Sequence, residues 1–195
     1  MKPLFLTNNV VGLRRFEPAD APQLFDAVHE SVRELCRFMT WCRPGYSLAA
    51  SQAFVAQSGS DWEKGEQYNL AMVDLEAGTL LGSIGLNRLD QTHRTANIGY
   101  WVRRSCAGRG VATAATRLIA EFGLKELGLH RLEILVPSHN AASRRVAEKA
   151  GARFEGILRN RLVLAGQRHN TCLYSLIPED LTPAPTRVAT TALVG

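Results

Sequence analysis

The most constraining feature of this sequence is one stretch, residues 97–127, in which an apolar strand leads through a basic glycine turn into a helix. Large side chains alternate at its start, which predicts a strand. Gly108 and Gly110 then interrupt the pattern, and apolar residues recur at helical spacing from Val111 to Phe122. The stretch therefore predicts a strand, a tight turn and a helix in immediate succession.

The glycine turn has the composition of an anion-binding site. A helix N-terminus carries unpaired N–H groups and partial positive charge. The glycines allow close approach of the backbone, and Arg103, Arg104 and Arg109 add full charge. Phosphate is the expected ligand, although a tight turn with solvated arginines would explain the same residues. The spacings of the nucleotide-triphosphate loop and of the dinucleotide fingerprint are both absent from the sequence.

A second polar pair stands at the start of another predicted helix. An apolar strand at 130–136 is followed by a helix at 141–150, with Asn140 as its N-cap. Ser143 comes three residues later, so both side chains lie on one face near the positive end of the helix. Either both contact a ligand, or Asn140 caps the helix and Ser143 bonds back to the cap.

The remaining pattern predicts a single domain at residues 1–180 and a flexible tail at 181–195, where periodicity is lost. Asp20 is the expected N-cap of the first helix. The other expected elements are a strand at 10–16, two or three helices within 21–64, a meander at 69–74, 80–89 and 94–102, and a last hairpin at 153–164 and 167–176.

Composition limits the classes of partner. The net charge of +5 favours an anionic partner such as a phosphorylated cofactor, an acidic substrate or RNA. The four cysteines and five histidines lack the spacings of metal ligands, so no metal site is predicted. No apolar run is long enough to span a bilayer, and the N-terminal residues do not form a secretory signal. We expect a cytoplasmic protein without a membrane partner.

Together these motifs resemble the GNAT superfamily of N-acetyltransferases. The family's pyrophosphate-binding turn has the pattern [QR]-x-x-G-x-[GA], and the hexamer from Ser105 to Gly110 matches it except at Ser105. This departure should weaken a side-chain contact without removing the backbone cradle. The run from Gly128 to Asn160 resembles the Rim-type branch of the family, which modifies ribosomal-protein N-termini, and the whole resemblance covers residues 8–180.

The resemblance implies an α/β (α+β) acetyltransferase fold, with a mixed, mostly antiparallel twisted sheet flanked by helices. It implies acetyl-CoA as cosubstrate, and a strand at 97–102 that splays from the next one and bonds the pantetheine arm. The implied cofactor-binding residues are Trp101, Val102, Arg103, Arg104, Ser105, Ala107, Gly108, Arg109, Gly110, Val111, Ala112, Thr113, Asn140 and Ser143.

The implied reaction is direct attack of a primary amine on the thioester in a ternary complex, the amine being a protein N-terminus or a small molecule. A backbone N–H of the splayed strand is expected to bind the oxyanion, and Ser143 to protonate the leaving thiolate. An α-amino group is about 10% neutral at pH 7, so it needs little help from a base. Glu66 is a candidate base acting through water, and a solvated surface carboxylate is the alternative.

Two further expectations concern partners. The alternative function is a non-catalytic module that binds RNA or the ribosome through its arginines. If the protein is an enzyme, we expect it to contact nucleic acid only when its substrate is part of the ribosome. A homodimer is predicted through the edge that residues 167–176 would expose in the last hairpin.

Overall fold

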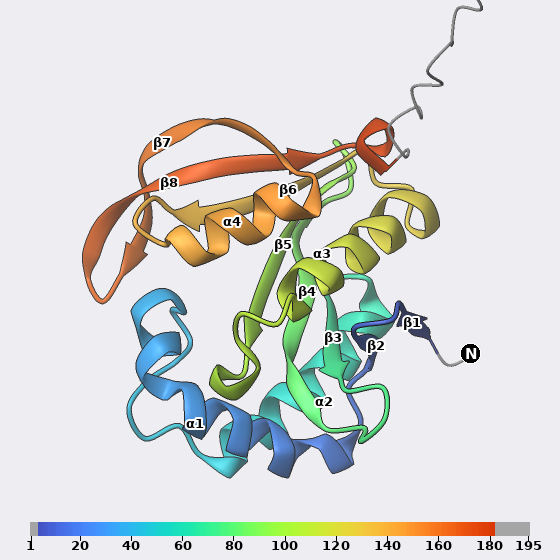
Figure 1. Cartoon of the computed structure of the whole chain (residues 1–195), viewed down its shortest axis with the longest axis vertical. Helices are drawn as coiled ribbons and strands as arrows, with labels where there is room; N and C mark the ends of the chain where they lie inside the picture. Colours follow the sequence, from blue (N-terminus) through green and yellow to red (C-terminus); the bar gives the residue numbers. More distant parts are fainter. Residues whose placement is uncertain (1–3, 182–195) are drawn as a thin grey trace, which may run out of the picture.

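The computed structural model describes residues 4–181, and the part of the expected tail from residue 182 onwards lies outside this range (Figure 1). One sheet of eight strands runs through the molecule. The strands are β1 (Phe5–Thr7), β2 (Gly12–Arg15), β3 (Tyr68–Val73), β4 (Leu80–Asp90), β5 (Thr95–Val102), β6 (Arg131–Pro137), β7 (Arg153–Leu164) and β8 (Gln167–Leu176). The helices are α1 (Ala21–Phe38), α2 (Leu48–Lys64), α3 (Val111–Glu121) and α4 (Ala141–Ala150).

The strand order is β1-β2-β3-β4-β5-β6-β8-β7. Every neighbouring pair is antiparallel except β5 with β6. The predicted mixed, mostly antiparallel sheet flanked by helices is therefore confirmed. Within residues 4–181, none of the helices has the length and apolar character needed to cross a membrane.

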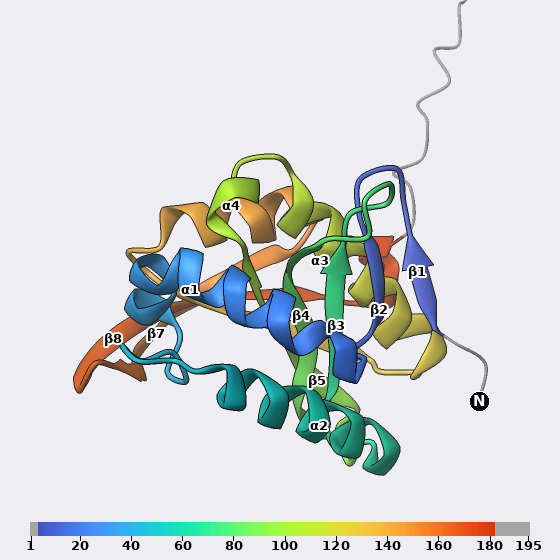
Figure 2. The same ribbon diagram turned by 90° about the horizontal axis from the view of Figure 1, so that it is seen from below.

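The helices cover the two faces of the sheet in pairs. α1 and α2 pack against a cluster that includes Ala71, Val73 and Trp101, while α3 packs against Leu86 and Ile98 on the other face. α3 and α4 lie next to each other, and α1 and α2 form a separate pair (Figures 1 and 2). Strand alternation decides this division, because successive side chains of β5 point to opposite faces.

The N-terminal region differs from the sequence prediction at two points. The expected strand at 10–16 is shorter, and it pairs with a strand that was not predicted, β1, whose three residues are too few to show alternation. Asp20 precedes α1 as expected but makes no side-chain cap. Its carboxylate is instead held by two Arg14 N–H groups, both at 2.7 Å, and by the backbone N–H of Glu17. The capping prediction for Asp20 was wrong because a charged partner from β2 competes for the carboxylate.

The last hairpin has the predicted bounds but not the predicted edge. β8 lies between β6 and β7, so residues 167–176 have strand partners on both sides. Cys172, Tyr174 and Leu176 of β8 are buried in the core, whereas β7 is mostly exposed. The prediction of a free edge at β8 was wrong, and β7 is the edge strand at this end of the sheet.

Candidate active site

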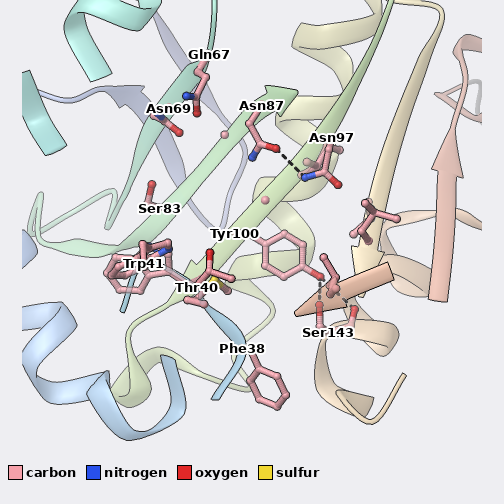
Figure 3. A pocket seen from close by; sticks show the side chains of 18 of the residues that line it. Phe38, Thr40, Trp41, Gln67, Asn69, Ser83, Asn87, Asn97, Tyr100 and Ser143 are labelled. Atoms are coloured by element: carbon pink, nitrogen blue, oxygen red, sulfur yellow. Dashed lines mark hydrogen bonds between the residues drawn. The ribbon is translucent and has the colours of Figure 1, made fainter. Parts of the chain in front are cut away.

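β5 and β6 form a fork in the sheet. They pair only from Thr95 to Asn97, opposite Arg131 to Glu133, and then separate. A cavity of about 540 Å³ opens at this fork, lined by both strands, the end of α1 and the start of α4 (Figure 3). The splayed strand expected at residues 97–102 is therefore present, and it borders a cavity large enough for a small ligand.

The glycine turn before α3 presents free backbone donors. Gly108 and Gly110 have φ of 79° and 81°, a left-handed conformation that favours glycine, and a Cβ at either position would meet open space. The first helical bond of α3 runs from Ala114 N to Gly110 O at 2.9 Å. In the described chain the N–H groups from Gly108 to Thr113 have no hydrogen-bond acceptor, as expected for an anion cradle.

Glu30 of α1 anchors the same turn, which the sequence did not indicate. Its carboxylate accepts hydrogen bonds from Arg103 Nε at 2.5 Å and from the backbone N–H of Ser105 at 2.7 Å. Both bonds, the one from Arg103 first, lower the pKa of Glu30 to about 2. Arg103 and the Ser105 N–H are thus engaged within the protein, whereas the side chains of Arg104 and Arg109 are exposed.

The start of α4 combines a cap with a hydroxyl pair. Asn140 Oδ1 accepts the Ser143 N–H at 3.1 Å, so Asn140 caps the helix as predicted. Ser143 Oγ lies 2.8 Å from Tyr100 Oη, and Tyr100 also donates to the Ser143 carbonyl at 3.1 Å (Figure 3). Burial raises the pKa of Tyr100 to about 12, so its hydroxyl stays protonated. The sequence analysis did not select Tyr100, although alternation along this strand places Tyr100 on the face opposite to Gly99 and Trp101.

Carboxamide side chains line the part of the cavity on the α1/α2 face. They are Gln67, Asn69, Asn87 and Asn97. Asn97 Nδ2 donates to Asn87 Oδ1 at 3.0 Å (Figure 3). Two glycines make room for this row, because a Cβ at Gly85 would overlap Asn69 Oδ1 and one at Gly99 would approach Asn87 Nδ2 to 3.0 Å. The amides therefore lie directly on the sheet.

An aromatic group borders the same region. Trp41, from the loop after α1, has its ring centroid 6.1 Å from that of Trp101 and 5.9 Å from that of Tyr46. Phe38, at the end of α1, packs against His139 beside the start of α4. The loop that carries Trp41 is thus held over the cavity, while the Trp41 side chain remains 43% exposed.

The cavity is almost uncharged. Among the described residues that line the cavity, Arg88 carries a charge and none has a carboxylate. Glu66 is exposed and is not part of the lining, whereas its neighbour Gln67 is. Among residues 4–181, no three His, Cys, Asp or Glu side chains are arranged to hold a metal ion. A ligand here would meet hydroxyl, amide and aromatic groups.

Comparison with known proteins identifies the family. Residues 11–153 match the family model described as the acetyltransferase (GNAT) domain. The chain belongs to this family. YdaF of Bacillus subtilis strain 168, named as a candidate ribosomal N-acetyltransferase, is 31% identical over 177 residues, which cover 89% of this chain and 94% of YdaF.

Two further comparisons describe the range of relatives. RimJ of Mycobacterium smegmatis, solved in complex with CoA-disulfide, superimposes with a TM-score of 0.81 at 25% identity, covering 93% of this chain and 88% of RimJ. Spermidine N(1)-acetyltransferase of Escherichia coli K12 is 28% identical over 120 residues, 59% of this chain and 64% of that enzyme.

The expected enzyme class is therefore confirmed. This GNAT protein is an N-acetyltransferase that moves an acetyl group from acetyl-CoA to an amine, and its relatives include Rim-type ribosomal-protein acetyltransferases. The alternative of a non-catalytic RNA- or ribosome-binding module gains no support from these relatives. The family alone leaves the acceptor amine open, since YdaF is named for a ribosomal acceptor and the Escherichia coli enzyme for spermidine, a polyamine.

Proposed function

We propose that this N-acetyltransferase acetylates a protein N-terminal amine by direct attack on acetyl-CoA within a ternary complex. The observation that supports this acceptor is the cavity at the β5/β6 fork, whose lining carries amides, aromatic rings and Arg88 but, in the described chain, no carboxylate. A polycationic acceptor such as spermidine would lack a counter-charge there. An α-amine, with the lowest pKa of the common biological amines, can enter neutral.

Acetyl-CoA lies along the turn and the fork. Its pyrophosphate accepts hydrogen bonds from the free N–H groups of residues 108–113, and Arg104 and Arg109 add positive charge. Its pantetheine arm follows β5 beside Trp101 and Val102, where β6 has moved away. Asn140 faces the arm with its Nδ2 group, because Oδ1 is already used to cap α4.

The chemistry needs few charged groups. The amine attacks the thioester carbon, a backbone N–H of the splayed strand stabilises the oxyanion, and the C–S bond then breaks. The Ser143 hydroxyl, hydrogen-bonded to Tyr100, gives a proton to the leaving thiolate and regains one from water. Water removes the amine proton, because Glu66 is exposed and lies outside the cavity lining. The role of Glu66 as a base that acts through such a water stays a prediction.

The test is an acceptor panel with acetyl-CoA as donor. It contains short peptides with free N-terminal Ser, Ala or Met, the same peptides with formylated N-termini, and spermidine. We expect the best free peptide to exceed spermidine in kcat/KM, formylation to abolish turnover, and mass spectrometry to locate the acetyl group on the α-amine. A preference for spermidine, or acetylation of formylated peptides at lysine, would contradict the proposed acceptor. Intersecting initial-rate plots are expected, whereas parallel plots would indicate an acyl-enzyme.

Dimerisation and a cytoplasmic location stay predictions. The corrected topology moves the expected dimer contact to β7, whose exposed residues include Phe154, Ile157 and Val163. Light scattering over a hundredfold range of protein concentration tests the dimer; a constant single-chain mass would rule it out.

A further inference from the structure

Two cysteines at the end of α1 have their sulfur atoms in direct contact. Cys36 lies in the last turn of the helix and Cys42 in the loop that follows, and their Sγ atoms are 2.7 Å apart as free thiols. The Cys42 thiol also donates to the carbonyl oxygen of Val32 at 3.8 Å. Two thiols in contact can join as a disulfide without rearrangement of the backbone, because the bond requires only a short approach of the sulfur atoms.

The two thiols differ in how easily a small molecule can reach them. Cys36 is half-buried and lines a second cavity, of about 500 Å³, between α1 and residues 44–46. Cys42 is 6% exposed and is not part of that lining. Burial, and after it the contact with Cys36, raises the pKa of Cys42 to about 12, so Cys42 stays a thiol. An accessible cysteine beside a second one that can resolve it is the arrangement of a redox-sensing pair.

The cysteine pair encloses a segment of the active-site cavity. Residues 38–41 lie between the two cysteines in the chain, and all of them line the cavity at the β5/β6 fork. The Cys42 N–H donates to the carbonyl oxygen of Met39 at 3.2 Å, which ties Cys42 to this segment. A bond between the two sulfurs would therefore close a covalent ring that contains Trp41.

We propose that Cys36 and Cys42 form a reversible disulfide on oxidation by a peroxide, and that this bond restricts residues 38–41. The Cys36 thiolate attacks one peroxide oxygen and the O–O bond breaks, giving a sulfenic acid and a hydroxide ion that takes up the proton lost by Cys36. Cys42 then attacks the Cys36 sulfur, the S–O bond breaks, and the departing hydroxide leaves as water with the Cys42 proton. The two thiols lose two electrons, and the peroxide is reduced to two waters. Dithiothreitol restores both thiols by exchange.

The disulfide is expected to affect the amine and not acetyl-CoA. Residues 38–41 border the part of the cavity that contains the amides, whereas the N–H groups of the cradle belong to the start of α3. A closed ring leaves residues 38–41 fewer conformations, so they adjust less well to a bound acceptor. This consequence rests on the proposed function, whereas formation of the disulfide does not.

Mass spectrometry after brief treatment with hydrogen peroxide tests the disulfide. Trypsin cleaves after Arg37, between the two cysteines, so the disulfide is detected as two joined peptides that separate on reduction. We expect these joined peptides from the wild-type protein and from Cys106→Ala. Cys42→Ala should instead accumulate a sulfenic acid on Cys36, which dimedone traps, and Cys36→Ala should leave Cys42 reduced. Wild-type protein that keeps both thiols, or that carries a sulfenic acid on Cys36 without joined peptides, would overturn the inference; neither result depends on the stability of a variant.

Kinetics before and after oxidation test the consequence. With the best acceptor of the panel, full oxidation should raise the acceptor KM by about threefold or more, and acetyl-CoA affinity by calorimetry should stay within about twofold. Dithiothreitol should restore the KM, and peroxide should leave the KM of Cys36→Ala unchanged. An unchanged KM in fully oxidised wild-type protein, or an equal rise in Cys36→Ala, would overturn the inference. Absence of turnover with every amine of the panel would instead refute the proposed function, and the joined peptides would still test the disulfide.

Discussion

The two sides of the cavity are built in different ways. The donor side, where acetyl-CoA as acetyl donor would bind, consists of the turn at 105–113 together with Tyr100, Asn140 and Ser143. It comes from two nearly continuous stretches of chain. The acceptor side consists of Trp41 and the row of amides, and it comes from a loop and three neighbouring strands with their flanks. The donor side offers mainly backbone groups and helix ends, whereas the acceptor side offers side chains.

This difference explains why one side carries motifs and the other does not. A backbone cradle depends on a few residues with special conformations, such as Gly108 and Gly110, and these must stand at fixed spacing. Side chains that meet across strands can come from any sequence with the right register. If the two sides are separate in function, changes on the donor side should alter acetyl-CoA binding or thiolate departure, and changes on the acceptor side should alter only the amine.

The largest expected effect is at the cradle. Gly110→Leu should lower acetyl-CoA affinity by more than about a hundredfold, because its side chain occupies the open space where the pyrophosphate meets the N–H groups and removes at least two charge-assisted hydrogen bonds. Calorimetry measures the affinity. Gly78→Leu is the matched control, since Gly78 also has positive φ and open space but lies in the β3–β4 turn. Equal affinities of the two variants would place the cradle elsewhere.

The hydroxyl pair comes next. Ser143→Ala should lower kcat by about ten- to a hundredfold with a smaller change in acetyl-CoA binding, because a thiol leaving group departs readily and needs only one proton donor. Tyr100→Phe should lower kcat less, since Tyr100 acts through Ser143. Full activity of Ser143→Ala at every pH would reduce Ser143 to a helix-start residue. An acetyl group trapped on Ser143 and found by mass spectrometry would indicate a covalent intermediate.

On the acceptor side, Trp41→Ala should raise the KM of the peptide acceptor by about three- to tenfold, as expected for truncation of one aromatic contact. Acetyl-CoA affinity should stay within about twofold. Phe5→Ala removes another exposed aromatic ring, on β1 and outside the cavity lining, and serves as the control. A parallel loss of acetyl-CoA affinity in Trp41→Ala would mean that the two sides are coupled.

The smallest expected effect concerns Glu30, which holds the donor-side turn to α1. Its pKa is depressed in the folded protein, so its contribution to stability is present above the unfolded pKa of about 4.3 and is lost as pH falls toward about 2. Glu30→Gln should lower the free energy of unfolding by about 1 kcal/mol at pH 7, and this difference should shrink over that acid range. Urea unfolding at several pH values measures it.

Glu34→Gln, one helical turn further along α1 at an exposed position, is the control for the loss of a carboxylate. A stability difference for Glu30→Gln that persisted unchanged at pH 2 would show that the carboxylate charge is not the cause.

The local units of the fold can be predicted from the amino-acid sequence. It predicted α4 with Asn140 as cap, the strand before the glycine turn, and the bounds of β7 and β8. These depend on interactions within a few residues: the left-handed conformation that only glycine adopts easily, a side chain that caps the next turn, and the alternation of a strand. Such rules act wherever the segment lies in the fold.

How those units meet depends on the folded arrangement of the whole chain. In the fold, β8 lies between β6 and β7, and Asp20 pairs with Arg14. Glu30 pairs with Arg103, and Tyr100 contacts Ser143. Asn87 and Asn97 are bonded across two neighbouring strands. Each of these contacts depends on strand register or on partners distant in the chain, and a shift of one residue would turn every side chain of a strand to the other face. Register is set by burial of the whole core, so no short segment contains it.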